Sequence, residues 1–167
     1  MKMRQIMALA VLSIALPVRA AEVTTSYNPD NYRRRFVLIV QSTEDYSSAL
    51  KTAEEAARKL GEELDLRGLT PHEYLGLTLA KDECEGRYKT FPCYSPRMGT
   101  DDEDPAKYVS IEYSNGYRNF QPRYYMVVPA VGTMSQRTRL KEALGKAKKY
   151  YPDAYIKETD IYNGCMH

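Results

Sequence analysis

Apolar side chains recur along this chain in runs and alternations that predict five β-strands. Residues 36–40 form the continuous run Phe-Val-Leu-Ile-Val, which is rich in β-branched side chains and typical of a buried strand. Weaker apolar alternation or clustering predicts four further strands, at residues 75–79, 109–113, 124–128 and 155–162. Because proline has no amide hydrogen to donate, we expect the fourth strand to stop pairing at Pro129.

Two segments repeat apolar residues at helical spacing. The first stripe comprises Tyr46, Ala49, Leu50, Ala53, Ala57, Leu60 and Leu64. Ser42 and Thr43 precede it and are candidate caps for its N-terminus. The second stripe comprises Leu140, Ala143, Leu144 and Ala147. Thr133 and Gln136 have the spacing of a capping box before it, and Pro152 and Asp153 stop it. We expect Leu50, Leu60, Leu140 and Leu144 to be core residues.

The order of these elements predicts an α+β domain. Two strand–helix units, residues 35–64 and 123–151, form a weak internal repeat. Two such halves sharing one antiparallel sheet predict a ferredoxin-like two-layer sandwich, with both helices on one face and the other face open. Residues 81–107 stand outside this pattern as an insertion, which contains three prolines and the acidic run 101–104. We interpret that acidic run as a solvated loop.

The first twenty residues have the form of a secretory signal peptide. Lys2 and Arg4 precede an uncharged, mostly apolar run at residues 6–16, and Val18 and Ala20 favour cleavage before Ala21. The run is too short to span a bilayer. We therefore expect a periplasmic or secreted protein without a membrane span after cleavage. Residues 21–32 are predicted to be a flexible lead-in, and residues 33–167 a single domain.

The mature chain is nearly neutral and rich in tyrosine. The whole chain carries 24 Lys and Arg against 22 Asp and Glu, and three of the basic residues lie in the leader. This balance argues against nucleic acid as a partner, because a nucleic-acid-binding domain usually presents a clearly basic surface. The chain has 15 tyrosines and no tryptophan. Tyrosine combines an apolar ring with a hydroxyl group, which suits binding surfaces.

Cysteine usage predicts one disulfide. The mature chain contains Cys84, Cys93 and Cys165, and three different single bridges could form among them. Cys84 and Cys93 share the insertion, so we expect this pair to be joined and Cys165 to be free. The cysteines and the two histidines lack the spacing of a zinc site. Since no hydrolase elbow, zinc-protease motif or phosphate loop is present either, the sequence predicts a protein that is not an enzyme and needs no cofactor.

Two stretches resemble the SPOR (sporulation-related repeat) family of bacterial envelope proteins. They are RRFVLIVQSTEDYSSALKTAEEAARKL and RYYMVVPAVGTMSQRTRLKEALGKAKKYYPDAYIKE, within residues 34–80 and 106–162. Asp153-Ala154-Tyr155-Ile156 is similar to the start of the family's last strand. The resemblance implies a module without catalytic activity that binds peptidoglycan glycan strands on its open sheet face.

The expected glycan contacts lie on that open face. If Val109, Ile111 and Tyr113 face the helices, Tyr108 faces outward. Tyr124, Arg118 and Arg123 are the other candidate ligand-binding residues, through ring stacking or hydrogen bonds to sugar hydroxyls and carboxylates. The alternative hypothesis is an exported protein-binding protein, such as an enzyme inhibitor or an immunity-type protein, that uses the insertion as its contact loop. The partner is then an envelope protein instead of a cell-wall glycan.

Overall fold

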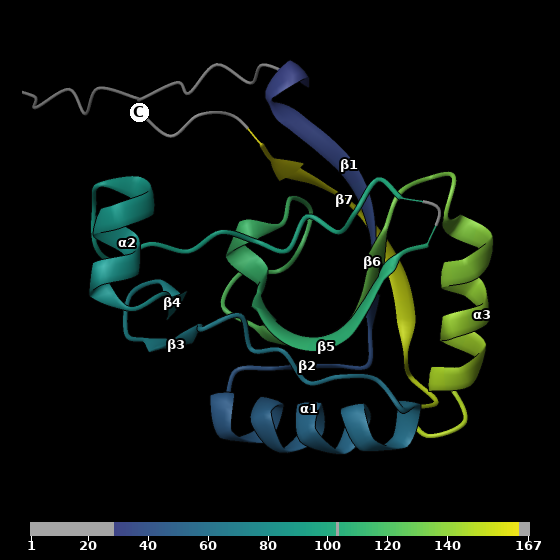
Figure 1. Ribbon diagram of the computed structural model, residues 1–167. Helices are drawn as coiled ribbons and strands as arrows, with labels where there is room; N and C mark the ends of the chain where they lie inside the picture. The colour runs from purple at the N-terminus through teal and green to yellow at the C-terminus, as the bar shows by residue number, and fades with distance from the viewer. Residues whose placement is uncertain (1–28, 103, 164–167) are drawn as a thin grey trace, which may run out of the picture.

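The computed structural model describes residues 29–102 and 104–163, which form a mixed α/β domain built on an antiparallel sheet (Figure 1). The sheet contains β1 (Tyr32–Ile39), β2 (Gln41–Thr43), β5 (Ala106–Tyr113), β6 (Tyr125–Gly132) and β7 (Tyr155–Tyr162). Strand β6 pairs with β5 on one side and with β1 and then β2 on the other, while β7 pairs with β1. Short 3-10 turns lie at Pro29–Asn31 and Ser114–Gly116.

Two helices cover one face of this sheet. Helix α1 (Tyr46–Leu60) packs against β5 and β6, and α3 (Arg137–Ala147) packs against β1, β6 and β7. Leu140 is fully buried as predicted, but Leu50, Leu60 and Leu144 are half-buried at the margin of the core. The buried residues of α1 are all alanines, at positions 49, 53, 56 and 57. Their small side chains bring the helix near the strands and leave its leucines at the edge.

The ends of the helices differ in part from the prediction. Asp45 caps α1 by accepting hydrogen bonds from the amides of Ser47 and Ser48, whereas Ser42 and Thr43 belong to β2. Gly61 ends α1 in the left-handed conformation at φ 69°, so Leu64, the last member of the predicted apolar stripe, lies beyond the helix.

Only one of the two hydrogen bonds of the predicted capping box before α3 is present. The amide of Thr133 donates to Oε1 of Gln136 at 2.7 Å, while the Thr133 hydroxyl contacts Ser135. The helix therefore begins one turn later, at Arg137. It ends before Pro152, as predicted.

Pro129 does not end its strand, because β6 continues to Gly132. On the β5 side of β6, the register shifts between Lys107 and Ser110, which is the place opposite Pro129. On the other side, the pairing passes from Leu38 in β1 to Gln41 in β2. Proline is tolerated at such an irregularity because no ladder amide is required there.

The segment 75–79 forms a strand, but outside the main sheet. Strand β4 (Gly76–Thr78) pairs with β3 (Thr70–His72) in a separate hairpin. The insertion that follows is not a plain loop, because it begins with helix α2 (Lys81–Tyr88). Figure 1 shows α2 and this hairpin together on one side of the sheet.

The expectation of an open sheet face is wrong. The face opposite α1 and α3 carries a second apolar cluster, whose buried members are Val37, Ile39, Tyr117, Met126, Val128, Val131 and Ile161. Met98 from the insertion and Phe120 from the connection between β5 and β6 pack on this cluster. The strand alternation is as predicted, but both faces are covered.

Candidate binding groove

The disulfide between Cys84 and Cys93 is present, which confirms the predicted pairing. It joins α2 to the segment 92–98, and both cysteines are buried. Cys165 and the leader 1–20 lie outside the described residues. The disulfide therefore holds together the two parts of the insertion that form the walls of the cavities below.

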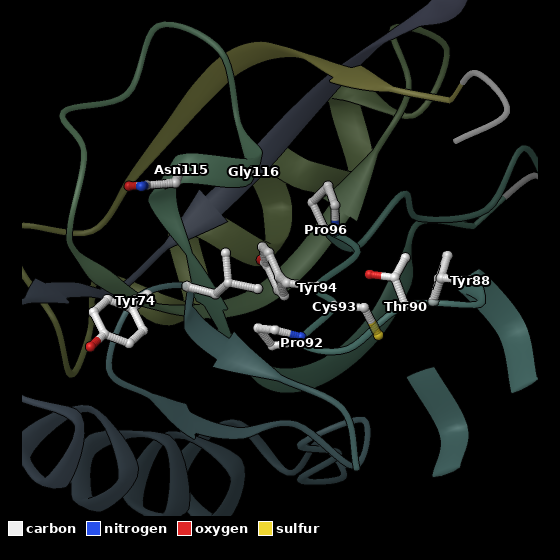
Figure 2. Close-up of a pocket in the computed structure, with 10 residues that line it drawn as sticks. Tyr74, Tyr88, Thr90, Pro92, Cys93, Tyr94, Pro96, Asn115 and Gly116 are labelled. Atoms are coloured by element: carbon white, nitrogen blue, oxygen red, sulfur yellow. The ribbon is translucent and has the colours of Figure 1, made fainter. Parts of the chain in front are cut away.

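A cavity of about 400 Å³ opens beside the disulfide (Figure 2). Its lining comprises Tyr74, Leu75, Tyr88, Thr90, Pro92, Cys93, Tyr94, Pro96, Asn115 and Gly116. In Figure 2, Tyr74 and Tyr88 lie on opposite sides, with Tyr94 and Pro92 between them. Tyr74 is 81% exposed, which is unusual for so large a side chain. The cavity is therefore mainly aromatic and apolar.

A second cavity of about 400 Å³ adjoins the first. The two share Tyr88, Tyr94, Pro96, Asn115 and Gly116, and the second adds Ser95, Met98, Tyr162 and Asn163. Among the described residues that line either cavity there is no Asp, Glu, Lys, Arg or His. We call the two cavities together the groove. It is uncharged, although 28% of the chain consists of charged residues.

Gly116 permits the close approach of chain segments that shapes the groove. A Cβ atom at this position would lie 2.8 Å from Cε1 of Tyr94 and 3.0 Å from Cβ of Pro96. Any other residue would push the 3-10 turn away from segment 94–96.

The floor of the groove is anchored to a buried carboxylate. Glu112 is fully buried, and its oxygens accept hydrogen bonds from the hydroxyls of Tyr94 and Tyr117, both at 2.9 Å. Nη1 of Arg67 donates to both oxygens, at 3.0 and 2.9 Å. Burial raises the pKa of Tyr94 and Tyr117 well above the ordinary tyrosine value, and the negative charge of Glu112 adds to this rise.

The arginines of this network are structural. Burial lowers the pKa of Arg97, whose guanidinium donates to the carbonyls of Tyr108, Val128 and Ala106. For Arg67, the desolvation effect is outweighed by the charge and hydrogen bonds of Glu112, which raise its pKa. These bonds attach segment 94–98 to the sheet face that the sequence predicted to be open.

The four predicted ligand-binding residues do not form one site. Tyr108 is half-buried and lines a separate cavity, with its ring centre 3.5 Å from the Cζ atom of Arg97. Tyr124 is half-buried, and its amide donates to the hydroxyl of Ser114. Arg118 is exposed and lies over the ring of Tyr32. Arg123 lines a fourth cavity.

The groove residues were missed because the sequence alone does not show what the insertion packs against. One signal was available, which is the alternation Pro92, Tyr94, Pro96 next to Cys93. In an extended segment, such alternation places the three side chains on one side.

Comparisons of the chain with protein-family models, with curated proteins and with solved structures found no match. Within residues 29–102 and 104–163, no group of three or more His, Cys, Asp or Glu could hold a metal ion. No helix in the described part of the chain has the length and hydrophobicity needed to cross a membrane.

Proposed function

We propose that this protein is an exported binding module without catalytic activity, and that its groove holds a segment of a partner protein. The observation that carries this proposal is the uncharged, aromatic groove, with large apolar side chains exposed in its lining and near it. Tyr74, Leu75 and Phe91 are 81%, 36% and 42% exposed, and the rings of Tyr74 and Phe91 both lie about 6 Å from that of His72. Such clustering is typical of protein-interaction surfaces.

The residues of the groove suit binding better than catalysis. The described lining holds no carboxylate, imidazole or amine, which are the usual groups for acid–base chemistry near neutral pH. Its one cysteine, Cys93, is held in the disulfide. These features support a protein that is not an enzyme and that uses the insertion as its contact region.

We also propose that the domain has a SPOR-like core and that the protein is exported. The order β5–β6–β1–β7, with α1 after β1 and α3 after β6, agrees with a ferredoxin-like sandwich and supports the proposed SPOR-like core. The leader 1–20 supports export to the periplasm or beyond. Intact mass of the exported protein tests this point, with a first residue of Ala21 expected and retention of the leader contradicting it.

An envelope glycan is the second candidate ligand. The specific observation in its favour is that Tyr74 and Tyr88 accompany the amide of Asn115 in one cavity, since sugars stack on tyrosine rings and bond to amides. On this proposal the glycan occupies the groove and not the sheet face, which is covered. The glycan then has no common binding site at the four residues predicted from the sequence, which are Tyr108, Tyr124, Arg118 and Arg123.

Selection from a random peptide library tests the proposed function. Displayed peptides should enrich on the oxidised mature protein, and the enriched peptides should bind the Tyr88→Ala and Tyr74→Ala variants at least tenfold more weakly. Tyr155→Ala is the matched control, because Tyr155 is 41% exposed but does not line the groove. Failure to enrich any peptide that depends on Tyr74 or Tyr88 contradicts a protein-binding groove. Sedimentation with murein sacculi, measured on the same variants, tests the glycan candidate.

A further inference from the structure

We infer that the groove binds a proline-containing segment in the polyproline II conformation, held across the two adjoining cavities. This inference rests on the proposed function and names the partner class for the same site. It is carried by the rigidity of the wall, by the division of the groove into two cavities, and by the absence of charge from its described lining.

The segment 92–96, which contributes to both cavities, is held in place before any ligand binds. Pro92, Tyr94 and Pro96 all line the first cavity. The proline rings restrict the backbone, and the Tyr94 hydroxyl is fixed by Glu112 and by the amide of Tyr113, at 2.9 Å each. A preformed surface loses little conformational entropy on binding. Aromatic grooves of this kind suit a polyproline II ligand, which is itself stiff.

Two adjoining cavities can accommodate one extended ligand of this kind. A polyproline II helix has three residues per turn and rises about 3.1 Å per residue, so side chains on one face recur every 9 Å or so. Tyr88 and Tyr94 are among the five residues that line both cavities. One extended ligand that lies along the groove can therefore place successive side chains in the two adjoining cavities.

The polar groups also fit this ligand. A polyproline II helix has no internal hydrogen bonds, and proline offers carbonyls but no amide hydrogen. The groove must then supply donors. Oδ1 of Asn115 accepts from the amide of Arg123 at 2.8 Å, which orients the side chain and leaves its NH₂ group as the donor. The segments 89–98 and 114–116 of the groove contain no strand, and Tyr162 at the end of β7 also lines the second cavity.

The lack of charge selects against other partners. An acidic or basic peptide anchored by salt bridges requires opposite charges in the groove, and none lies among its described lining residues. The same feature disfavours a glycan that carries carboxylates. An uncharged proline-rich segment can be buried against this lining without leaving a charge unpaired.

The test is titration of the oxidised mature protein with an acetylated, amidated decaproline peptide, followed by amide chemical shifts. Chemical shift changes are expected for the backbone amides of Tyr88, Asn115 and the two neighbours of Pro96, Ser95 and Arg97. Saturable binding should weaken at least fivefold in Tyr88→Ala and in Asn115→Ala. Tyr74→Ala serves as a second groove variant, because a side chain that is 81% exposed can be removed without unfolding the domain. Tyr155→Ala should bind like the wild type, and a (Gly-Ser)₅ peptide should not bind.

The outcomes separate the inference from the function on which it rests. If decaproline does not bind while library peptides do so through Tyr74 or Tyr88, the polyproline inference is overturned and the protein-binding function stands. If neither binds, both are overturned. Binding of an N-acetylglucosamine hexamer in place of either peptide overturns both in favour of the glycan candidate.

Discussion

The hydroxyl of Tyr94 donates to Oε2 of Glu112 at 2.9 Å, and the ring of the same Tyr94 forms the floor of the groove. One side chain thus connects the surface proposed for binding with a carboxylate that is fully buried. The position of the floor depends on Glu112, Arg67 and Tyr117, which do not line the groove. Stability of the sheet face and shape of the groove are consequently linked.

Replacement of Glu112 by glutamine should destabilise the protein strongly. The change leaves Arg67 and Arg97 without the negative charge that compensates them, and breaking a buried ion pair typically costs about 3–5 kcal/mol. Urea unfolding measures this loss. Glu158→Gln is the control, because Glu158 is 50% exposed and its pair with Arg34 contributes about 0–1 kcal/mol. Equal effects of the two substitutions contradict the role of Glu112.

Alkaline pH should unfold the protein through Tyr94 and Tyr117. Their pKa values are raised in the folded state, by burial and then by Glu112, so the folded protein keeps these protons at a pH where the unfolded chain loses them. The stabilising effect is complete below about pH 10 and is lost as pH rises above that value. The free energy of unfolding, measured from pH 8 to 11, should therefore fall at the alkaline end.

The double variant Tyr94→Phe/Tyr117→Phe is the reference for this pH profile. It should be less stable at neutral pH, since two hydrogen bonds to Glu112 are removed, but its stability should fall less between pH 9 and 11. A slope identical to that of the wild type shows that other groups cause the alkaline loss.

Removal of the disulfide should loosen the groove more than the sheet. In a Cys165→Ser background, the change of Cys84 and Cys93 to serine should cost about 2–3 kcal/mol on the chain-entropy estimate for a ring of this size. Hydrogen exchange should accelerate in α2 and in segment 92–98 while β1 and β6 stay protected. Reductant should reproduce the effect in the parent and have none in the variant. Uniform acceleration across the sheet contradicts a local role.

Truncation of two leucines on α3 should destabilise the protein to different extents, because one lies in the core and the other at its margin. Leu140→Ala should cost about 2–5 kcal/mol, because Leu140 is completely buried between α3 and the sheet. Leu144→Ala should cost distinctly less, since this side chain is half-buried and solvent can fill the space left behind. Thermal or urea unfolding of both variants measures the difference. A larger loss for Leu144→Ala contradicts the packing described for this helix.

Much of the fold was predictable because its signals are local. The strands at residues 109–113 and 155–162 and both long helices follow from apolar periodicity, which reports which side of an element is buried. The pairing of Cys84 with Cys93 follows from a separation of nine residues within one insertion. The predicted site failed for a different reason. Val109, Ile111 and Tyr113 belong to the core beneath the helices, but nothing near Tyr108 in sequence indicates what covers the opposite face.

The sequence by itself determined the apolar periodicity of the long elements and the order of the four long strands and two long helices of the main sheet, and it favoured the local disulfide. Only the tertiary structure decided that Glu112 is buried, because its partners Arg67 and Arg97 lie 45 and 15 residues away. A charged residue in an alternating strand is ordinarily expected to face water. Here Glu112 faces inward, because the folded insertion brings the hydroxyl of Tyr94 and the amide of Arg97 to its carboxylate, which Arg67 and Tyr117 reach from other parts of the chain. The contact with Tyr94 also positions the floor of the groove.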